Sequence, residues 1–294
     1  MLNVAAGAAS LGSERARAIH DACCAVADAA GVDWLPRAKA FDIAFEGDPD
    51  AVRAALRPVV RDEWLLDVNV VRSTDRRRKL LIADMDSTIV GCECIDELAD
   101  FVGLKPKVAA ITERAMRGEL DFPSALRERV ALLKGLPLEA MAKVYAERVH
   151  LNRGARELVA TMRANGGYAL LVSGGFTYFT ERVAAEAGFD SHQGNILADD
   201  GKALTGRVED PILGREAKLE ALETTVARLG WSTDDALAVG DGANDLDMIK
   251  RAGLGVAYHA KPVVAAAAGA SIVHGDLTGL LYLQGYRADE IRKN

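Results

Sequence analysis

Two carboxylates stand one residue apart at the point where an apolar run ends. The run is residues 80–83, LLIA, and Asp84, Met85 and Asp86 follow it directly. One aspartate of such a pair can attack phosphorus as a nucleophile. The other points in a different direction along an extended chain, so it can protonate the leaving oxygen and then activate water. Taken alone, such a pair is more often a helix cap or a turn, but together with the polar residues described next it favours phosphoryl transfer through an aspartyl-phosphate.

Other polar residues lie near the ends of further apolar runs. Ser173 and Gly174 lie at the end of YALLVSGG, and Asp241, Asn244 and Asp245 lie at the end of ALAVGDGAND. Lys218 lies in the helical segment that precedes ALAVGDGAND. Each of them alone is more typical of a helix cap or a turn, but their order along the chain favours one shared site. The carboxylate oxygens of Asp84 and Asp241 are hard ligands, which suit Mg²⁺. Lys218 and the donors at Ser173 and Gly174 can neutralise phosphoryl oxygens.

The elements that must position these residues alternate between strands and helices. Apolar runs predict strands at residues 80–86, 168–175, 236–245, 254–260 and 271–275. Helical patterns lie between them at residues 155–165, 177–187, 214–230 and 262–268. Continuous apolar strands are typical of a parallel sheet that is buried on both faces. We therefore expect an α/β fold with a doubly wound parallel sheet, which binds ligands at the carboxyl ends of its strands.

A long insertion interrupts this alternation. The first two core strands are separated by roughly 80 residues, far more than a crossover helix needs. Residues from about 91 to 152 are mostly helical in pattern, as in PKVAAITERAMRGE and FPSALRERVALLKG. An insertion directly after a strand end predicts a helical cap over the site.

Residues 1–72 predict a separate small α+β domain, which a linker at residues 72–78 joins to a core domain of residues 79–294. Strands are expected at residues 2–5, 38–45 and 64–71, and helices at 13–30, with Ser13 as N-cap, and at 49–61. This order suits a ferredoxin-like fold. It also resembles ACT-type regulatory domains, which bind amino acids, although a structural role or a homodimer contact is an equal alternative. A chain that begins near Ser73 is expected to keep the chemistry.

The composition limits the class of partner. The chain has 294 residues, 50% of them hydrophobic, and a net charge of −7, which argues against non-specific binding to nucleic acid or an anionic membrane. No uncharged apolar stretch reaches the ~20 residues that span a bilayer. The basic run at residues 76–79 is expected to be a solvated linker. Four cysteines without zinc-site or disulfide spacing favour the reducing cytoplasm.

The motifs DMDST at residues 84–88 and GDGANDLDM at 240–248 resemble the signatures of the haloacid dehalogenase-like (HAD) superfamily, whose nucleophile motif is DxDx[TV]. Within it, the chain resembles the phosphoserine phosphatase family. DMDSTIVGCECIDE matches the family pattern DxDSTxxxxExIDE, and FPSALRERVALLKG matches a stretch of its cap. The similarity covers about residues 79–286. It implies hydrolysis of O-phospho-L-serine to L-serine and phosphate, the last step of phosphorylated serine biosynthesis.

The resemblance also implies a role for each residue at the strand ends. Asp84 would be the nucleophile and Asp86 the acid and base. Mg²⁺ would be held by the side chains of Asp84 and Asp241 and by the backbone carbonyl of Asp86. The phosphoryl group would be held by Asn244, Lys218, Ser173 and Gly174.

In the cap, the resemblance implies that Glu93 binds the substrate ammonium and Arg129 its carboxylate, while Met116 and Phe122 line the closed cap. These residue types also make chemical sense, because phosphoserine carries one cation and one carboxylate besides its phosphate. An arginine can bind a carboxylate through two parallel hydrogen bonds. Taken alone, Glu93 and Arg129 would more often be surface charges of the cap.

Two other functions use similar residues. A phosphatase or phosphotransferase for another small phosphomonoester would share the aspartyl-phosphate, but it gives no reason for Glu93 and Arg129. A phospho-acceptor signalling domain also uses a strand-end aspartate with a lysine. Such a domain has no cap insertion, and it needs no general acid at Asp86.

Overall fold

A six-stranded parallel sheet lies at the centre of the molecule, as the apolar runs predict. The computed structural model describes residues 1–7, 11–117 and 119–293. Across the sheet the strands follow the order β14 (Ala270–Ile272), β13 (Leu254–Tyr258), β12 (Ala236–Gly240), β7 (Leu80–Ala83), β8 (Tyr168–Phe176) and β9 (Ser191–Asn195). Neighbouring strands are parallel throughout. The predicted α/β class with a parallel core sheet is confirmed.

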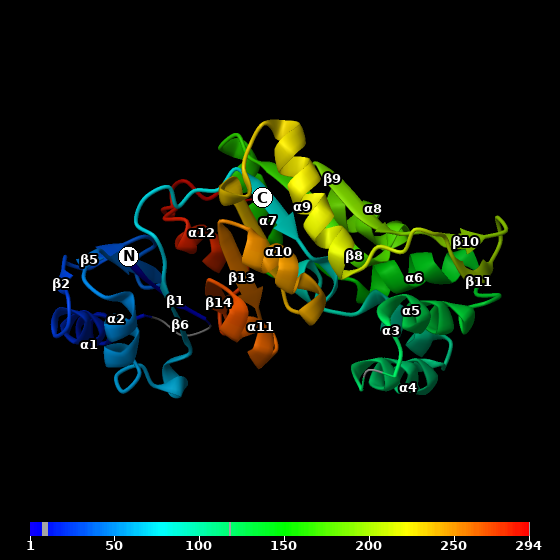
Figure 1. The fold of residues 1–294 in the computed structure, drawn as a ribbon, viewed down its shortest axis with the longest axis horizontal. Coiled ribbons are helices and arrows are strands. Elements are labelled where there is room, and N and C mark those ends of the chain that lie inside the picture. Colours follow the sequence, from blue (N-terminus) through cyan, green and yellow to red (C-terminus); the bar gives the residue numbers. More distant parts are fainter. Residues whose placement is uncertain (8–10, 118, 294) are drawn as a thin grey trace.

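Alternate residues of the central strands face opposite layers of helices (Figure 1). Leu81 and Ala83 pack toward α7 (Ala155–Ala164), α8 (Thr177–Ala187) and α12 (Gly279–Leu283). Leu80 and Ile82 pack toward α9 (Arg215–Leu229) and α10 (Leu246–Arg251). Because successive side chains of a strand point to opposite faces, an unbroken apolar run buries both faces. The sheet is therefore doubly wound.

The described residues of the insertion between Val90 and Leu151 form the helices α3 (Cys94–Phe101), α4 (Lys105–Met116), α5 (Phe122–Ala131) and α6 (Leu138–Arg148). The chain enters and leaves this segment side by side, because Val90 forms an antiparallel bridge with Leu151 and the Gly91 amide donates to the His150 carbonyl over 3.3 Å. The segment is therefore connected to the core by two adjacent, antiparallel stretches of backbone near the end of β7.

A hairpin from the core also contacts these helices. It consists of β10 (Leu197–Asp199) and β11 (Leu204–Val208), which the sequence pattern did not predict. The Gly135 amide donates to the Leu204 carbonyl over 2.8 Å, and the Leu204 amide donates to the Leu136 carbonyl over 2.9 Å. The hairpin thus fixes the end of α5 against the core.

The described residues between 2 and 70 form a small antiparallel sheet with two helices. Its strand order is β3 (Asp33–Trp34), β4 (Ala40–Ile43), β1 (Leu2–Ala6) and β6 (Leu66–Val70). Helices α1 (Ser13–Cys24) and α2 (Pro49–Leu56) bury Ile19 and Val52 against this sheet. Figure 1 shows this N-terminal unit and helices α3–α6 at opposite ends of the molecule.

Several predicted boundaries in the N-terminal unit are wrong. The helix expected over residues 13–30 ends at Cys24, because Asp28 and Ala29 (β2) pair with Phe45 and Glu46 (β5). Gly12, rather than Ser13, occupies the N-cap position. The second helix ends at residue 56 instead of 61, and the strand expected over residues 64–71 covers 66–70.

The N-terminal unit docks on the core where β6 approaches the edge strand β14. The side-chain amide of Asn69 donates to the Ser271 carbonyl over 3.0 Å, and its oxygen accepts from the Ser271 amide over 2.8 Å. Asp67 accepts from the amides of Val273, His274 and Gly275 over 2.7, 3.0 and 2.8 Å. Both side chains are buried. At this junction, hydrogen bonds between the side chains of Asp67 and Asn69 and the backbone join the two sheets.

We find no helix that is long and apolar enough to cross a membrane among the residues that the structure describes.

Candidate active site

The carboxyl end of β7 carries Asp84, in the middle of the sheet. Its amide donates to the Val239 carbonyl of β12 over 3.0 Å, and its carboxylate accepts from the Met85 amide over 2.8 Å. A turn, Met85–Ile89, follows, in which Asp86 keeps an extended backbone and Ser87 has a left-handed φ of 56°. A non-glycine residue rarely adopts this conformation. The turn keeps Asp86 at the edge of the sheet although the strand has ended.

Lys218 of α9 joins two buried carboxylates. Its Nζ lies 2.7 Å from Asp84 Oδ1 and 2.6 Å from Asp245 Oδ1, and all three side chains are buried. Burial raises the pKa of Asp84 well above its ordinary value and repulsion by Asp245 adds to this, while Lys218 opposes both. Burial alone lowers the pKa of Lys218, but attraction to Asp84 and Asp245 outweighs it and raises that pKa. The lysine therefore stays charged.

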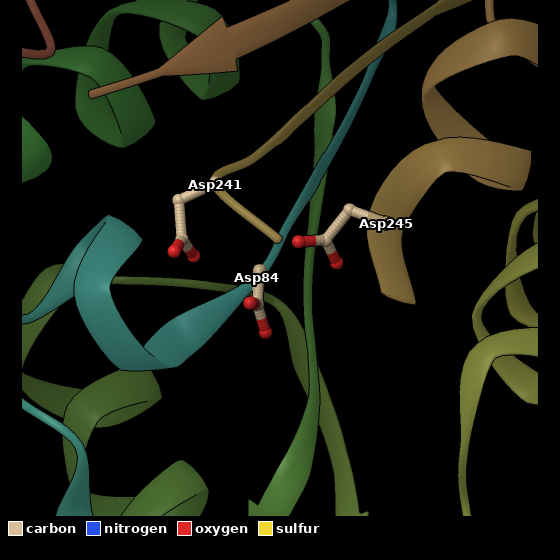
Figure 2. A group of neighbouring side chains, drawn as sticks. All are labelled: Asp84, Asp241 and Asp245. Atoms are coloured by element: carbon tan, nitrogen blue, oxygen red, sulfur yellow. The ribbon is translucent and has the colours of Figure 1, made fainter. Parts of the chain in front are cut away.

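Asp241 completes a group of three carboxylates at the ends of β7 and β12 (Figure 2). One oxygen from each of Asp84, Asp241 and Asp245 lies within 4.8 Å of the others. Asp241 also accepts from the Thr88 hydroxyl over 3.3 Å. Burial, followed by repulsion from Asp245, raises the pKa of Asp241 to about 6. Three hard carboxylates against one lysine leave an excess of negative charge, and this donor set fits a small divalent cation.

Asp86 lies in a different environment from Asp84. Its Oδ1 accepts from the Cys94 amide at the start of α3 over 3.0 Å, and its Oδ2 accepts from the Ser173 hydroxyl at the end of β8 over 3.4 Å. Burial, followed by repulsion from Glu93, raises the pKa of Asp86 to about 7. A carboxyl group with a pKa near neutrality can both give and take a proton.

The last residues of β8, where its pairing with β9 becomes irregular, lie directly against Asp86. The Ser173 hydroxyl accepts from the Gly175 amide over 2.8 Å, and the Gly174 carbonyl accepts from the side chain of Asn195 over 2.8 Å. A Cβ at Gly175 would lie 2.7 Å from Asp86 Oδ2, which is too close for any side chain. The sequence therefore needs glycine here for the end of β8 to approach the carboxylate.

The side chain of Phe122 connects the helical insertion to this end of β8. Phe122 is the first residue of α5, and a Cβ at Gly174 would lie 3.0 Å from its Cζ. A Cβ at Gly214, just before α9, would lie 3.3 Å from its Cδ1. The ring thus covers two core segments beside the carboxylates. Met116, also predicted to line the cap, is the last residue of α4, and its side chain lies outside the part of the chain that the structure describes.

Glu93 and Arg129 are the two predicted charged residues of the cap. Glu93 directly precedes α3, and its Oε1 accepts from the Ser87 hydroxyl over 2.7 Å. The Nε of Arg129 donates to the Ala125 carbonyl within α5 over 3.2 Å. Burial lowers the pKa of Arg129, while the nearby charges of Asp96 and Glu93 raise it. The guanidinium forms no ion pair within 4 Å among the described residues, so its terminal nitrogens can bind a carboxylate.

Asn244 also lies at this edge, in the turn that follows β12. Its Oδ1 is close to Gly242, where a Cβ would lie only 2.2 Å away. The structure thus brings Asn244 to the loop that carries Asp241 and Asp245.

Four contributing side chains were not assigned roles from the sequence. Asp245 binds Lys218, Thr88 binds Asp241, and Ser87 binds Glu93. All three lie inside motifs that sequence analysis singled out, so their positions were visible although their partners were not. Asn195 supports the Gly174 carbonyl from β9, a strand whose polar sequence SHQGN gave no signal.

Comparison with known proteins gives consistent results. Residues 81–250 match the family model of haloacid dehalogenase-like hydrolases. A phosphoserine phosphatase of Albidiferax ferrireducens is 50% identical over 210 residues, which are 70% of this chain and 89% of that protein. An unliganded structure of a probable phosphoserine phosphatase from Vibrio cholerae superposes with a TM-score of 0.77 and 33% identity, covering 97% of this chain and 86% of the other. A substrate-bound phosphoserine phosphatase structure has a TM-score of 0.64 and 40% identity, covering 70% and 97%.

Proposed function

The chain belongs to the phosphoserine phosphatases of the haloacid dehalogenase-like hydrolase family, and we propose that it hydrolyses O-phospho-L-serine through an aspartyl-phosphate on Asp84. The products are L-serine and inorganic phosphate, which makes this the last step of phosphorylated serine biosynthesis. One observation carries the assignment of roles. Asp84 shares a buried lysine with Asp245, whereas Asp86, among the described residues, accepts hydrogen bonds from the Cys94 amide and the Ser173 hydroxyl. Carboxylates whose environments differ in this way can divide the roles of nucleophile and acid.

In the first step, an oxygen of ionised Asp84 attacks the phosphorus atom. The bond between phosphorus and the seryl oxygen breaks, and Asp86 gives its proton to that oxygen, so serine leaves as a neutral alcohol. In the second step, Asp86 accepts a proton from water, whose oxygen attacks the same phosphorus and releases Asp84. Lys218, Asn244 and the donors of Ser173 and Gly174 hold the phosphoryl oxygens during both steps.

We propose Mg²⁺ as the metal, held by the carboxylates of Asp84 and Asp241, with the Asp86 backbone carbonyl as a third ligand. The fit rests on the three carboxylate oxygens within 4.8 Å of one another and on their excess negative charge. When bound, the ion neutralises phosphoryl charge and reduces the repulsion between the phosphate dianion and the nucleophile. Asp245 belongs to the same cluster, but its contact with Lys218 gives it the role of fixing the lysine.

We propose that the cap reads the amino-acid end of the substrate. Glu93 would bind the ammonium and Arg129 the carboxylate, with Phe122 and Met116 as the apolar lining. The Ser87 hydroxyl already holds the Glu93 side chain next to the DMDST turn. Binding energy from these contacts can hold the cap closed and exclude water from the phosphoryl site.

The direct test is phosphate release from O-phospho-L-serine with and without Mg²⁺, measured against a panel of other small phosphomonoesters. We expect Mg²⁺-dependent activity with phosphoserine preferred. A phosphomonoester without an amino-acid end that is hydrolysed equally well would contradict the proposed roles of Glu93 and Arg129.

We further propose that residues 1–72 form one domain and residues 79–294 another, with the cap at about 91–152. All four cysteines are free thiols, which supports a cytoplasmic location. A homodimer formed through the N-terminal unit is a further proposal, which sedimentation velocity tests.

A further inference from the structure

The basic linker lines a cleft near the amino ends of strands β7 and β13, whereas the active site lies at the carboxyl ends of the strands. The cleft has a volume of about 290 Å³ and lies between the linker, the end of α10 and the start of β13. Its cations are Arg72, Arg76, Arg78 and Lys250, and its apolar lining includes Ile249 and Leu283. No aspartate or glutamate is among the described residues that line it. In a chain whose net charge is −7, such a lining is a notable concentration of positive charge.

One of the four cations is already neutralised. Arg76 forms an ion pair with Asp42 and donates to the carbonyls of Tyr282 and Leu283. It therefore serves the docking of the N-terminal unit.

The other three cations form no ion pair among the described residues, although Asp75, Asp234 and Asp235 lie near Arg78. Among the described residues, no carboxylate lies within 4 Å of the charged nitrogens of Arg72, Arg78 or Lys250. Arg78 donates to the carbonyls of Asp234 and Gly253 over 2.7 and 3.2 Å. Its Nε is buried and has no hydrogen-bond partner among the described residues. Burial, and then the nearby charge of Arg72, lowers the pKa of Arg78, while the charges of Asp234, Asp235 and Asp75 oppose this.

A bound oxyanion would satisfy these groups together. Guanidinium groups bind phosphate and carboxylate oxygens through paired hydrogen bonds, and a lysine adds a point charge. The volume is at the lower end of the range for small-molecule sites, and such sites often lie between domains. We propose that this cleft binds a small oxyanion, a phosphate or carboxylate group, at a site separate from the catalytic carboxylates. The proposal does not depend on the proposed reaction.

The test is isothermal titration of inorganic phosphate into the full-length protein with Mg²⁺, at constant ionic strength. Phosphate also binds the active site as a product. Its inhibition constant against phosphoserine gives the affinity of the active site, so the binding events with that affinity in the titration can be assigned to the active site. The wild-type protein should show a second class. In the double variant Arg72→Gln/Lys250→Gln, the affinity of the second class should fall at least tenfold while the inhibition constant stays unchanged. Both residues are exposed, so the fold should survive, which circular dichroism checks.

Arg77→Gln is the matched control. Arg77 belongs to the same basic run, but it pairs with Glu290 and stacks on Tyr286 instead of lining the cleft. Its substitution should leave both classes unchanged, whereas Arg78→Lys, which keeps the charge and loses the fork, should weaken the second class. Displacement by malonate would support a site for oxyanions in general, and resistance to malonate would support one for phosphate. A single class in the wild type, or an unchanged second class in the double variant, would overturn the proposal.

Discussion

Replacing Arg129 with alanine tests whether the cap reads the amino acid. The guanidinium is partly buried in α5, uses its Nε to bind the Ala125 carbonyl, and forms no ion pair among the described residues. In Arg129→Ala, the substrate carboxylate would enter the closed cap without its partner. Glu93 would still be held by Ser87 and could still bind the ammonium.

The expected loss follows from the burial of this group. A hydrogen bond to a charged group contributes ~1.5–3 kcal/mol, and removing one partner of a desolvated charge pair costs ~2–5 kcal/mol. Because Arg129 is only partly buried, we expect ~2–4 kcal/mol in kcat/KM for phosphoserine, which corresponds to a roughly 30- to 900-fold decrease. p-Nitrophenyl phosphate has no carboxylate and should be affected little.

The assay is the ratio of kcat/KM for the two substrates in the wild type and the variant. Arg127→Ala is the control, because Arg127 lies two residues earlier in α5, is exposed and pairs with Asp210. Its ratio should not change. Equal losses on both substrates in Arg129→Ala would show that Arg129 serves the phosphate or the fold, and the reasoning from the cap would fail.

The remaining predictions test other parts of the molecule. Asp84→Asn is nearly isosteric and should keep the fold but lose many decades of phosphoserine turnover; substantial activity in the purified variant would exclude covalent catalysis there. Asp86→Asn should slow phosphorylation of the enzyme more with phosphoserine than with p-nitrophenyl phosphate, whose leaving group needs less protonation; equal losses in single-turnover experiments would contradict the acid role. Chelation should abolish activity and Mg²⁺ restore it. Since the pKa of Asp241 is raised to about 6, the group holds a proton below that pH, so the Mg²⁺ affinity measured by calorimetry should fall as the pH drops through 6. Asp67→Ala leaves three backbone amides without their acceptor and should lower the free energy of unfolding by ~2–4 kcal/mol in urea titrations, whereas Asp62→Ala, at an exposed site, should not.

The core strands could be predicted because both faces of the sheet are buried. Each central strand is an unbroken apolar run, and such runs are typical of strands that are buried on both faces. The edge strand β9 has the polar sequence SHQGN and is only partly buried, so its pattern resembles a loop. The prediction that the first helix reaches residue 30 was wrong for another reason. Residues 25–30 have a helical pattern, but Asp28 and Ala29 instead form a strand that pairs with the distant residues Phe45 and Glu46. Pairing between distant segments is not visible in a local pattern.

The candidate site shows the same division. The motifs located Asp84, Asp86 and Asp241, because strand ends and spacing are properties of the sequence. They did not distinguish the role of Asp245, since one carboxylate of GDGAND looks like the other until Lys218 is placed beside it. Partners of side chains depend on packing, and packing emerges only in the folded chain.

The sequence of the N-terminal unit contains no predicted catalytic residue, but this does not tell how much the unit contributes to stability. The expectation that a chain beginning near Ser73 keeps its chemistry rests on the absence of predicted site residues before that point. The structure adds a cost to this truncation, because the docking bonds of Asp67 and Asn69 with the region after β14 would be lost. The truncated chain should therefore be less stable even if its catalytic residues are complete.

The one-residue spacing of the two aspartates has a physical reason in their surroundings. Burial raises the pKa of both. Of the two, Asp84 is the one that pairs with Lys218, while Asp86 accepts from the neutral donors of Cys94 and Ser173. The carboxylate that must be ionised to attack lies beside the cation, and the one that must carry a proton lies away from it. In the turn Met85–Ile89, Asp86 reaches Ser173 of β8, while the backbone of Asp84 stays paired with β12.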